Sequence, residues 1–319
     1  MVRRLLIALA LTGLSLPAAA GGPRAKPARA KPQKVQIGKP TRKVVVNQRM
    51  MKLRGIRSLP APRSEVQAGL RRYRAVRHRV RELRQRPGSM MTVKPLAKVG
   101  SFVIDRLDFK IPGSAPKPKI LIVGGVHAGS ERIGVESAMQ IAEQLHKHPD
   151  ILEHFDVTIV PLANPSSLAI RSRRNSSDVD VNRSFAAGKM TPESKAMSKL
   201  MKQERFGAVL DLHGAGKFRT GFFFIRGGQD GGLAARTMRV LPKSKLLDNK
   251  GAGKVYELDA PGVVTSTNPN TLKHHAIANG AKYAYTVESP KRFSPQVQIA
   301  GMVKLSLRAM RNMKGKLSR

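Results

Sequence analysis

The sequence predicts an α/β fold in which a mostly parallel sheet is covered by helices on both faces. From about residue 98 onwards, short apolar runs typical of buried strands alternate with longer stretches of helical periodicity. Strands separated by helices favour parallel pairing, because each helix returns the chain to the same end of the sheet. The chain has no cysteine, so the domain needs a large core in place of disulfide bonds. The section from about residue 95 is long enough to form such a core.

The first 62 residues are expected to lie outside this domain. Residues 1–20 have the pattern of a secretory signal peptide, with Arg3 and Arg4 before an apolar run and a small-residue cleavage site near Ala20. The apolar run is too short for a membrane span. Residues 21–62 are rich in Pro, Lys, Arg, Ala and Gly, so we expect a basic disordered arm. These features predict a bacterial protein that is periplasmic or secreted, without a transmembrane segment in the mature chain.

Residues 63–88 are predicted to form an amphipathic helix. Ser64 and Gln67 fit a capping box, and apolar residues follow at three- and four-residue steps as far as Leu83. Pro87 and Gly88 then end the pattern. The opposite face is crowded with arginine, so the helix could pack on the domain, pair with another helix or lie on an anionic surface.

The net charge of +39 predicts adhesion to polyanions. Anionic cell-wall polymers or a membrane surface are the expected partners of the basic arm. Specific nucleic-acid binding is not expected, because aromatic residues make up only 4% of the chain and no base-stacking or groove-reading motif is present. Without cysteine, any metal must be bound by His, Asp or Glu side chains.

The catalytic domain is expected to span residues 95–313, and its elements follow in order. Strands are predicted over residues 102–109, 120–126, 157–162, 208–212, 222–225 and 283–287. Helices are predicted over 131–147, near 192–203, over 233–241 and over 297–313. A turn is expected at 112–118, and a long polar loop separates the strand at 157–162 from the helix near 192.

Two histidines and a glutamate are candidate metal ligands. His127 and Glu131 follow the apolar run 120–126, and His213 ends the run 208–212 beside Gly214. The ends of strands before helices are where open α/β sheets bind ligands. Together these three residues form a His/Glu/His set, which is one standard arrangement for a catalytic zinc ion with an open position for water.

Polar residues of the long loop and of a third strand end add candidate catalytic groups. The loop 171–185 contains arginines that could clamp a substrate carboxylate, an asparagine that adds a neutral donor, and aspartates that could orient a metal-bound imidazole. Glu288 follows the strand 283–287 and would suit a general base that activates a zinc-bound water.

The ordered motifs GGVHxxxE, NPxxxxxxxRxNxxDVDVNRSF, LDLHG and TVESP resemble those of the zinc carboxypeptidase (M14-type metallocarboxypeptidase) superfamily. That superfamily includes murein-peptide carboxypeptidases and, as a sister branch, the succinylglutamate desuccinylase/aspartoacylase deacylases. The resemblance covers residues 98–312. It implies a mixed, mostly parallel twisted sheet with helices on both faces.

The resemblance also implies roles for individual residues. His127, Glu131 and His213 would bind one zinc ion per chain, and Asp180 would orient the first histidine. Glu288 would be the general base and acid, and Arg173 would polarise the scissile carbonyl. Asn182 and Arg183 would bind the terminal carboxylate of the substrate. The mobile tyrosine of the family is not assigned to a residue of this chain; Tyr256 is the nearest positional match and is left out of the candidate site.

One departure from the family pattern concerns the metal site. The family places two residues between its first histidine and its glutamate, whereas this chain has Ala128, Gly129 and Ser130 between them. If the first helical turn absorbs the extra residue, Glu131 still reaches the metal, and Gly129 would supply the flexibility. If it does not, the site is weakened or inactive.

Three functions are therefore open. The first is an exported zinc metallocarboxypeptidase that cleaves an amide bond next to a free carboxylate, for which a cell-wall peptide is a plausible substrate. Only a closing helix follows Glu288, which favours this branch over the deacylases with their added β domain. The second is an N-acyl amino acid deacylase. The third is a non-catalytic envelope-binding protein on the same fold.

Overall fold

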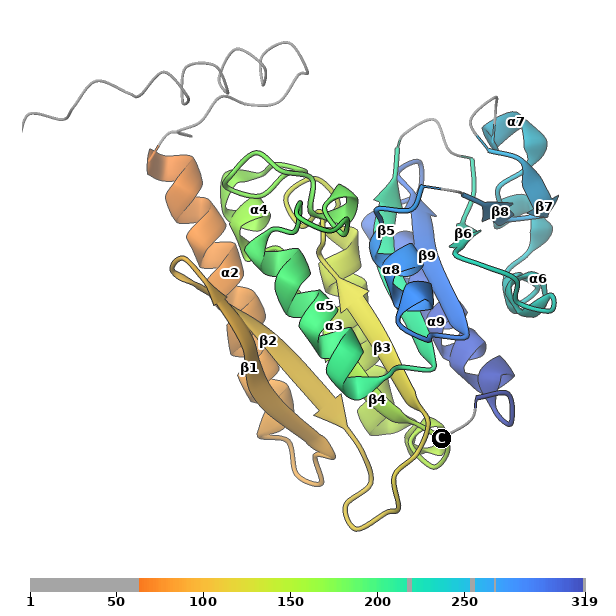
Figure 1. Cartoon of the computed structure of the whole chain (residues 1–319), viewed down its shortest axis with the longest axis horizontal. Helices are drawn as coiled ribbons and strands as arrows, with labels where there is room; N and C mark the ends of the chain where they lie inside the picture. The colour runs from red at the N-terminus through yellow and green to blue at the C-terminus, as the bar shows by residue number, and fades with distance from the viewer. Residues whose placement is uncertain (1–62, 217–219, 253–255, 267, 318–319) are drawn as a thin grey trace, which may run out of the picture. The chain divides into compact units, whose positions relative to one another are not determined.

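The computed structural model describes residues 63–216, 220–252, 256–266 and 268–317, and the expected signal peptide and basic arm lie outside these residues. The strands of the described part form one sheet in the order β1-β2-β4-β3-β5-β9-β6-β8-β7 (Figure 1). They are β1 (Met91–Val99), β2 (Phe102–Phe109), β3 (Lys119–Gly124), β4 (Asp156–Val160), β5 (Ala208–Ala215), β6 (Phe223–Arg226), β7 (Leu258–Ala260), β8 (Val263–Thr265) and β9 (Tyr283–Pro290).

The centre of the sheet is parallel, as the sequence predicts. Strands β4, β3, β5 and β9 pair in parallel, and their apolar runs are buried on both faces. Antiparallel pairs β2–β4 and β6–β9 flank this centre, which makes the sheet mixed. Because β3, β5 and β9 are neighbours and run in the same direction, the residues at their carboxyl ends meet at one edge of the sheet.

Helices cover both faces of the sheet. They are α2 (Arg63–Arg84), α3 (Ile133–Lys147), α4 (Pro165–Ile170), α5 (Pro192–Glu204), α6 (Leu233–Met238), α7 (Asn249–Ala252), α8 (Leu272–Ala278) and α9 (Pro295–Met313), with short 3₁₀ helices η1 (Pro149–Ile151), η2 (Val181–Arg183) and η3 (Lys243–Lys245). Helices α2, α3, α6 and α9 share one apolar core with the sheet, and α5 and α8 share the other. None of the helices in the described ranges is long and apolar enough to cross a bilayer.

Helix α2 packs on the domain, which decides among the three alternatives left open by its pattern. Its apolar side chains, including Val80 and Leu83, are buried in the core that α3 and α9 also form. Arg79 forms ion pairs with Glu136 (2.6 Å) and Glu143 (3.4 Å) of α3. The helix ends at Arg84, four residues before the expected end at 88.

The elements that the sequence pattern did not indicate are short or lie near the edges of the sheet. Strand β1 begins at Met91, ahead of the expected domain start at residue 95, and pairs with β2 along its whole length. Pro95 and the exposed Lys94 and Lys98 hide its apolar alternation. Strands β7 and β8 have three residues each, and α4 and α8 are short helices.

Candidate metal centre and active site

The stretch from His127 to Glu131 folds into a single helical turn at the end of β3. The His127 carbonyl accepts hydrogen bonds from the backbone N–H groups of Ser130 (3.1 Å) and Glu131 (2.8 Å). A residue and its fourth successor lie on the same side of such a turn, so both side chains point to one centre. The turn therefore accommodates the one residue that this chain has in addition to the family spacing, and the Glu131 side chain still reaches His127.

Gly129 is needed in this turn because the chain approaches it closely. A Cβ atom at this position would lie 2.1 Å from the Ser167 carbonyl oxygen and 2.4 Å from the Ser172 backbone nitrogen. The Gly129 backbone N–H donates to the Ser167 hydroxyl (3.3 Å). The turn is thus fixed between α4 and the loop that follows α4, and the role of Gly129 is close packing.

Three candidate ligand atoms converge at this turn. His127 Nδ1 lies 3.1 Å from His213 Nδ1 and 3.4 Å from Glu131 Oε2, and His213 Nδ1 lies 2.9 Å from the same oxygen. Zinc binds such ligands at about 2.0–2.2 Å in a tetrahedron, which requires ligand atoms about 3.3 Å apart. The separations found here fit that requirement.

A carboxylate fixes the far side of each imidazole. His127 Nε2 lies 2.7 Å from Asp180 Oδ1, and His213 Nε2 lies 2.8 Å from Asp211 Oδ2. If each Nε2–H donates to its carboxylate, both Nδ1 lone pairs face each other and Glu131. The facing lone pairs repel one another unless a cation lies between them. A carboxylate that accepts the other ring N–H is the usual partner of a metal-bound histidine. The donor set therefore fits a zinc ion.

Charge at the centre is consistent with cation binding. Burial opposes the ionisation of Glu131, but His127 and His213 hold its pKa well below its usual range. Burial would lower the pKa of His213, but Asp211 and Glu131 raise it well above its usual range. Burial also opposes the ionisation of Asp180, and the hydrogen bond with His127 keeps its pKa below the usual range.

Asp211 was missed by the sequence analysis. It is fully buried on β5, two residues before His213. Residues two apart on a strand point to the same face, so the alternation in Asp211-Leu212-His213 was the available signal. An acidic residue within a buried apolar run is rare unless it is paired, which is the second reason to notice it.

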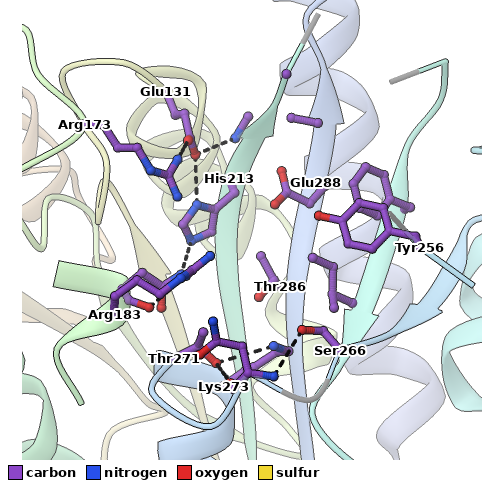
Figure 2. Close-up of a pocket in the computed structure, with 17 residues that line it drawn as sticks. Glu131, Arg173, Arg183, His213, Tyr256, Ser266, Thr271, Lys273, Thr286 and Glu288 are labelled. Atoms are coloured by element: carbon purple, nitrogen blue, oxygen red, sulfur yellow. Dashed lines mark hydrogen bonds and ion pairs between the residues drawn. The ribbon is translucent and has the colours of Figure 1, made fainter. Parts of the chain in front are cut away.

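Arg173 lies beside Glu131 and His213, two of the candidate metal ligands (Figure 2). Its guanidinium donates to Glu131 Oε1 and to Asp180 Oδ2 (3.1 Å). The side chain is 41% exposed and lines the cavity, so it is available to a substrate while its two carboxylate partners hold it in place.

Asn182 and Arg183 lie on η2, whose start is capped by Asp180 accepting the Asn182 backbone N–H (3.0 Å). The Asn182 side chain is bound within the protein: its oxygen accepts the Leu272 N–H (2.9 Å), and its nitrogen donates to Asp211 Oδ2 (3.3 Å). Arg183 donates to the Asn182 carbonyl (2.9 Å) and lines the cavity. Of the pair, Arg183 is the more available to a ligand.

Glu288 lies next to His213 in the register of β5 and β9. Its Oε2 atom is buried and has no hydrogen-bond partner among the described residues. Burial raises the pKa of Glu288 to about 7, while the nearby His213 opposes this shift. A carboxylate with such a pKa can both accept and return a proton near neutral pH.

One cavity of about 470 Å³ joins these groups. Glu131, Arg173, Asn182, Arg183, His213 and Glu288 line it, together with Tyr256, Ser266, Thr271, Lys273 and Thr286. His127 and Asp180 do not line it. Among the lining residues, Lys273 is the charged one that the sequence analysis did not single out.

Comparisons with known proteins agree with this geometry. Residues 116–291 match the family model described as the succinylglutamate desuccinylase/aspartoacylase catalytic domain. The chain is 32% identical over 114 residues to carboxypeptidase SOL1 of Arabidopsis thaliana, a match that covers 31% of this chain and only 23% of that protein.

Solved structures show the same fold at low sequence identity. A candidate metallopeptidase from Shewanella denitrificans is 19% identical, with a TM-score of 0.62 over 76% of this chain and 90% of that one. Bovine thrombin-activatable fibrinolysis inhibitor is 13% identical, with a TM-score of 0.60 over 77% of this chain and 97% of that one. Since the family match spans more than half of the chain and includes the ends of β3, β5 and β9, the protein belongs to the succinylglutamate desuccinylase/aspartoacylase catalytic domain family, within the zinc carboxypeptidase-like superfamily.

Proposed function

We propose that the protein is a zinc-dependent hydrolase that cleaves an amide bond next to a free carboxylate. The observation that carries this proposal is that the His127, Glu131 and His213 ligand atoms lie within 4.8 Å of one another. Glu131 and His213 share their cavity with a half-buried carboxylate, Glu288, and an arginine, Arg183. These are the parts that amide hydrolysis needs: a metal site, a base and an anchor for the substrate.

The reaction adds water across the amide bond. Zinc, when bound by the three ligands, supplies a Lewis acid that polarises the carbonyl and acidifies the attacking water. Glu288 accepts the proton as the water oxygen bonds to the carbonyl carbon. It then delivers that proton to the nitrogen as the C–N bond breaks, which yields a carboxylic acid and an amine. Arg173 is placed to stabilise the negative charge that develops on the carbonyl oxygen.

Arg183 is the proposed anchor for the free carboxylate, because a guanidinium can donate two parallel hydrogen bonds to a carboxylate. Asn182 supports it by joining η2 to the start of α8 through its hydrogen bond with Leu272.

Two substrate classes fit this chemistry: a peptide with a free carboxyl terminus and an N-acyl amino acid. The family match favours the deacylase, because its description names two deacylases. The resemblance to carboxypeptidase SOL1 and the expected export favour a peptidase acting on cell-wall peptides. Under either reading, the expected basic arm would hold the enzyme near anionic cell-wall polymers or a membrane surface in the periplasm or outside the cell.

Zinc content and hydrolysis, measured on the same preparations, test the proposal. Wild-type protein should bind about one zinc per chain and hydrolyse members of a panel of N-acyl amino acids and muropeptides. Glu288→Gln should keep its zinc and lose about 10²–10⁴-fold in kcat/KM, because the proton carrier is gone. Glu153→Gln, an exposed change of the same type far from the cavity, should behave as wild type.

The panel also separates the remaining functions. Turnover of acyl amino acids alone identifies a deacylase, and turnover of muropeptides alone identifies a peptidase. If protein prepared with excess zinc binds none and hydrolyses neither class, the proposal is overturned. That result would favour the non-catalytic envelope-binding protein.

A further inference from the structure

The outward face of helix α2 carries arginine side chains that have no acidic partner among the described residues. The helix contains eight arginines and no lysine. Two of the arginines serve packing: Arg77 forms an ion pair with Asp105 of β2 (2.8 Å), and Arg79 pairs with two glutamates of α3. The exposed arginines of residues 67–86 form no ion pair with any described residue; they are Arg71, Arg74, Arg81, Arg84 and Arg86.

Three of these side chains, Arg71, Arg74 and Arg81, lie along one side of the helix, and we call them the arginine ridge. Residues three or seven positions apart fall on the same side of an α-helix, and all three are exposed. At 1.5 Å per residue, the ridge extends about 15 Å along the helix axis. Glu82 is the one acidic residue of positions 67–84, and it lies 3.3 Å from His78.

The ridge has an electrostatic cost in the free protein. Like charges three residues apart on a helix repel each other, and the pairs Arg71–Arg74 and Arg81–Arg84 have this spacing. The helix is held on the domain by its apolar face, so these exposed guanidinium groups are not needed for packing. A chain of anions that lies along the ridge would replace the repulsion with attraction.

The surroundings of the ridge indicate which polyanion fits. A helix that binds a bilayer inserts its apolar face, but the apolar face of α2 is buried in the domain core. Among the exposed residues of 67–86, Ala75 is the one small apolar side chain before Pro87, and none is Phe, Tyr or Trp, so nucleic-acid bases have no such ring to stack on. A guanidinium group donates two parallel hydrogen bonds to a phosphate, which an ammonium group cannot do. The use of arginine alone therefore favours phosphate groups.

We propose that the arginine ridge of α2 is a binding surface for a linear polymer of phosphate groups. The surface is fixed to the catalytic domain, because a Cβ atom at Gly69 would lie 2.1 Å from the Ala169 carbonyl oxygen of α4. Helix α2 lies beside α4 (Figure 1), and the loop that carries Arg173 and Asp180 begins directly after α4. A polymer bound to the ridge is thus bound by the domain that holds the candidate active site, in addition to the expected basic arm.

The salt dependence of binding tests this proposal on the full chain. Fluorescence anisotropy measures the affinity for labelled inorganic polyphosphate at several NaCl concentrations. Each phosphate contact contributes about 0.7 to the slope of log K against log salt concentration for a single-stranded phosphate chain. The triple variant Arg71→Gln, Arg74→Gln, Arg81→Gln should therefore reduce the slope by about 2 and the affinity at about 0.1 M salt by about 10- to 100-fold.

A matched variant separates the ridge from net charge. Lys195→Gln, Lys199→Gln and Lys202→Gln together remove three positive charges from exposed positions of α5 at similar helical spacing. This variant should keep the wild-type slope and affinity. Equal losses in the two triple variants would show that net charge alone attracts the polymer, and would overturn the proposal.

A second ridge variant keeps the test decisive if the glutamine variant does not fold, as judged by circular dichroism. Replacing all three ridge arginines with lysine keeps the charge and removes the paired donors of the guanidinium. The salt slope should remain, and the affinity should fall by about 3- to 10-fold. Wild-type affinity in this lysine variant would contradict recognition by guanidinium groups.

Vesicles of phosphatidylglycerol test the alternative occupant, an anionic membrane. If the glutamine variant loses vesicle binding and keeps its affinity for polyphosphate, the surface binds membranes and the proposal is overturned. Polyphosphate binding requires neither zinc nor turnover, so Glu288→Gln should bind the polymer as wild type does. The outcome is therefore independent of whether the proposed hydrolysis is found.

Discussion

At the scale of single residues, the site depends on carboxylates that lie behind the histidines. Asp180 and Asp211 occupy equivalent positions on His127 and His213, at 2.7 and 2.8 Å from the outer ring nitrogens. Each fixes which ring nitrogen carries a proton and therefore which one is free for a metal. The sequence analysis predicted an acidic partner for His127 alone. The structure shows that His213 has one as well.

Asp211→Asn should weaken zinc binding by about 10- to 100-fold, the usual cost of losing a carboxylate behind a metal-bound histidine. The amide can also turn its NH₂ group toward His213 and favour the wrong tautomer. Competition with a chromogenic chelator measures the zinc Kd. Asp150→Asn, an exposed change of the same type, is the control and should leave the zinc Kd unchanged. If Asp211→Asn also leaves the zinc Kd unchanged, Asp211 has no part in the metal site.

At the scale of elements, the turn between β3 and α3 decides whether this chain keeps a metal site. One helical turn from His127 to Glu131 accommodates three intervening residues and returns the glutamate to the histidine. The cost is a backbone packed so closely that only glycine fits at position 129.

Gly129→Ala should therefore destabilise the fold by about 1–3 kcal/mol, as expected for overpacking. Zinc affinity should fall as well, because the displaced turn carries both His127 and Glu131. Urea denaturation and zinc titration measure the two effects. Gly228→Ala is the matched control, since its added Cβ would make only an ordinary contact at 3.8 Å with Ile277.

The strands that the sequence revealed most directly are those that are buried on both faces of the sheet. Strands β3 and β5 are continuous apolar runs, and their ends marked His127 and His213 as neighbours. Strand β1 was missed because one of its faces is exposed and carries lysine. Lys273 was missed because lysine in a short helix ordinarily indicates a solvent-exposed position, and only the tertiary fold places it in the cavity.

At the scale of the whole molecule, we expect metal binding and stability to be linked. The ligands come from a turn after β3 and from the end of β5, so they meet only in the folded sheet. An ion that binds the folded chain and not the unfolded chain raises stability by mass action.

Zinc at about 100 times its Kd should add about 2.7 kcal/mol to the free energy of unfolding. For a domain of this size, that corresponds to a rise in Tm of about 5–10 °C. Differential scanning calorimetry of chelator-treated and zinc-loaded protein measures the shift. Glu131→Gln should remove most of the zinc-dependent rise in Tm, and Glu153→Gln should retain it. Equal rises in the two variants would show that the zinc binds elsewhere.

The order of the site residues along the chain has a consequence for how such enzymes diverge. The proposed metal ligands all precede residue 214, whereas Ser266, Thr271 and Lys273 belong to a later segment that contributes no metal ligand. Mutation in the later segment can therefore change the lining of the cavity while the candidate metal ligands stay in place. Among related sequences, the residues of this later segment are expected to vary, and positions 127, 131 and 213 to persist.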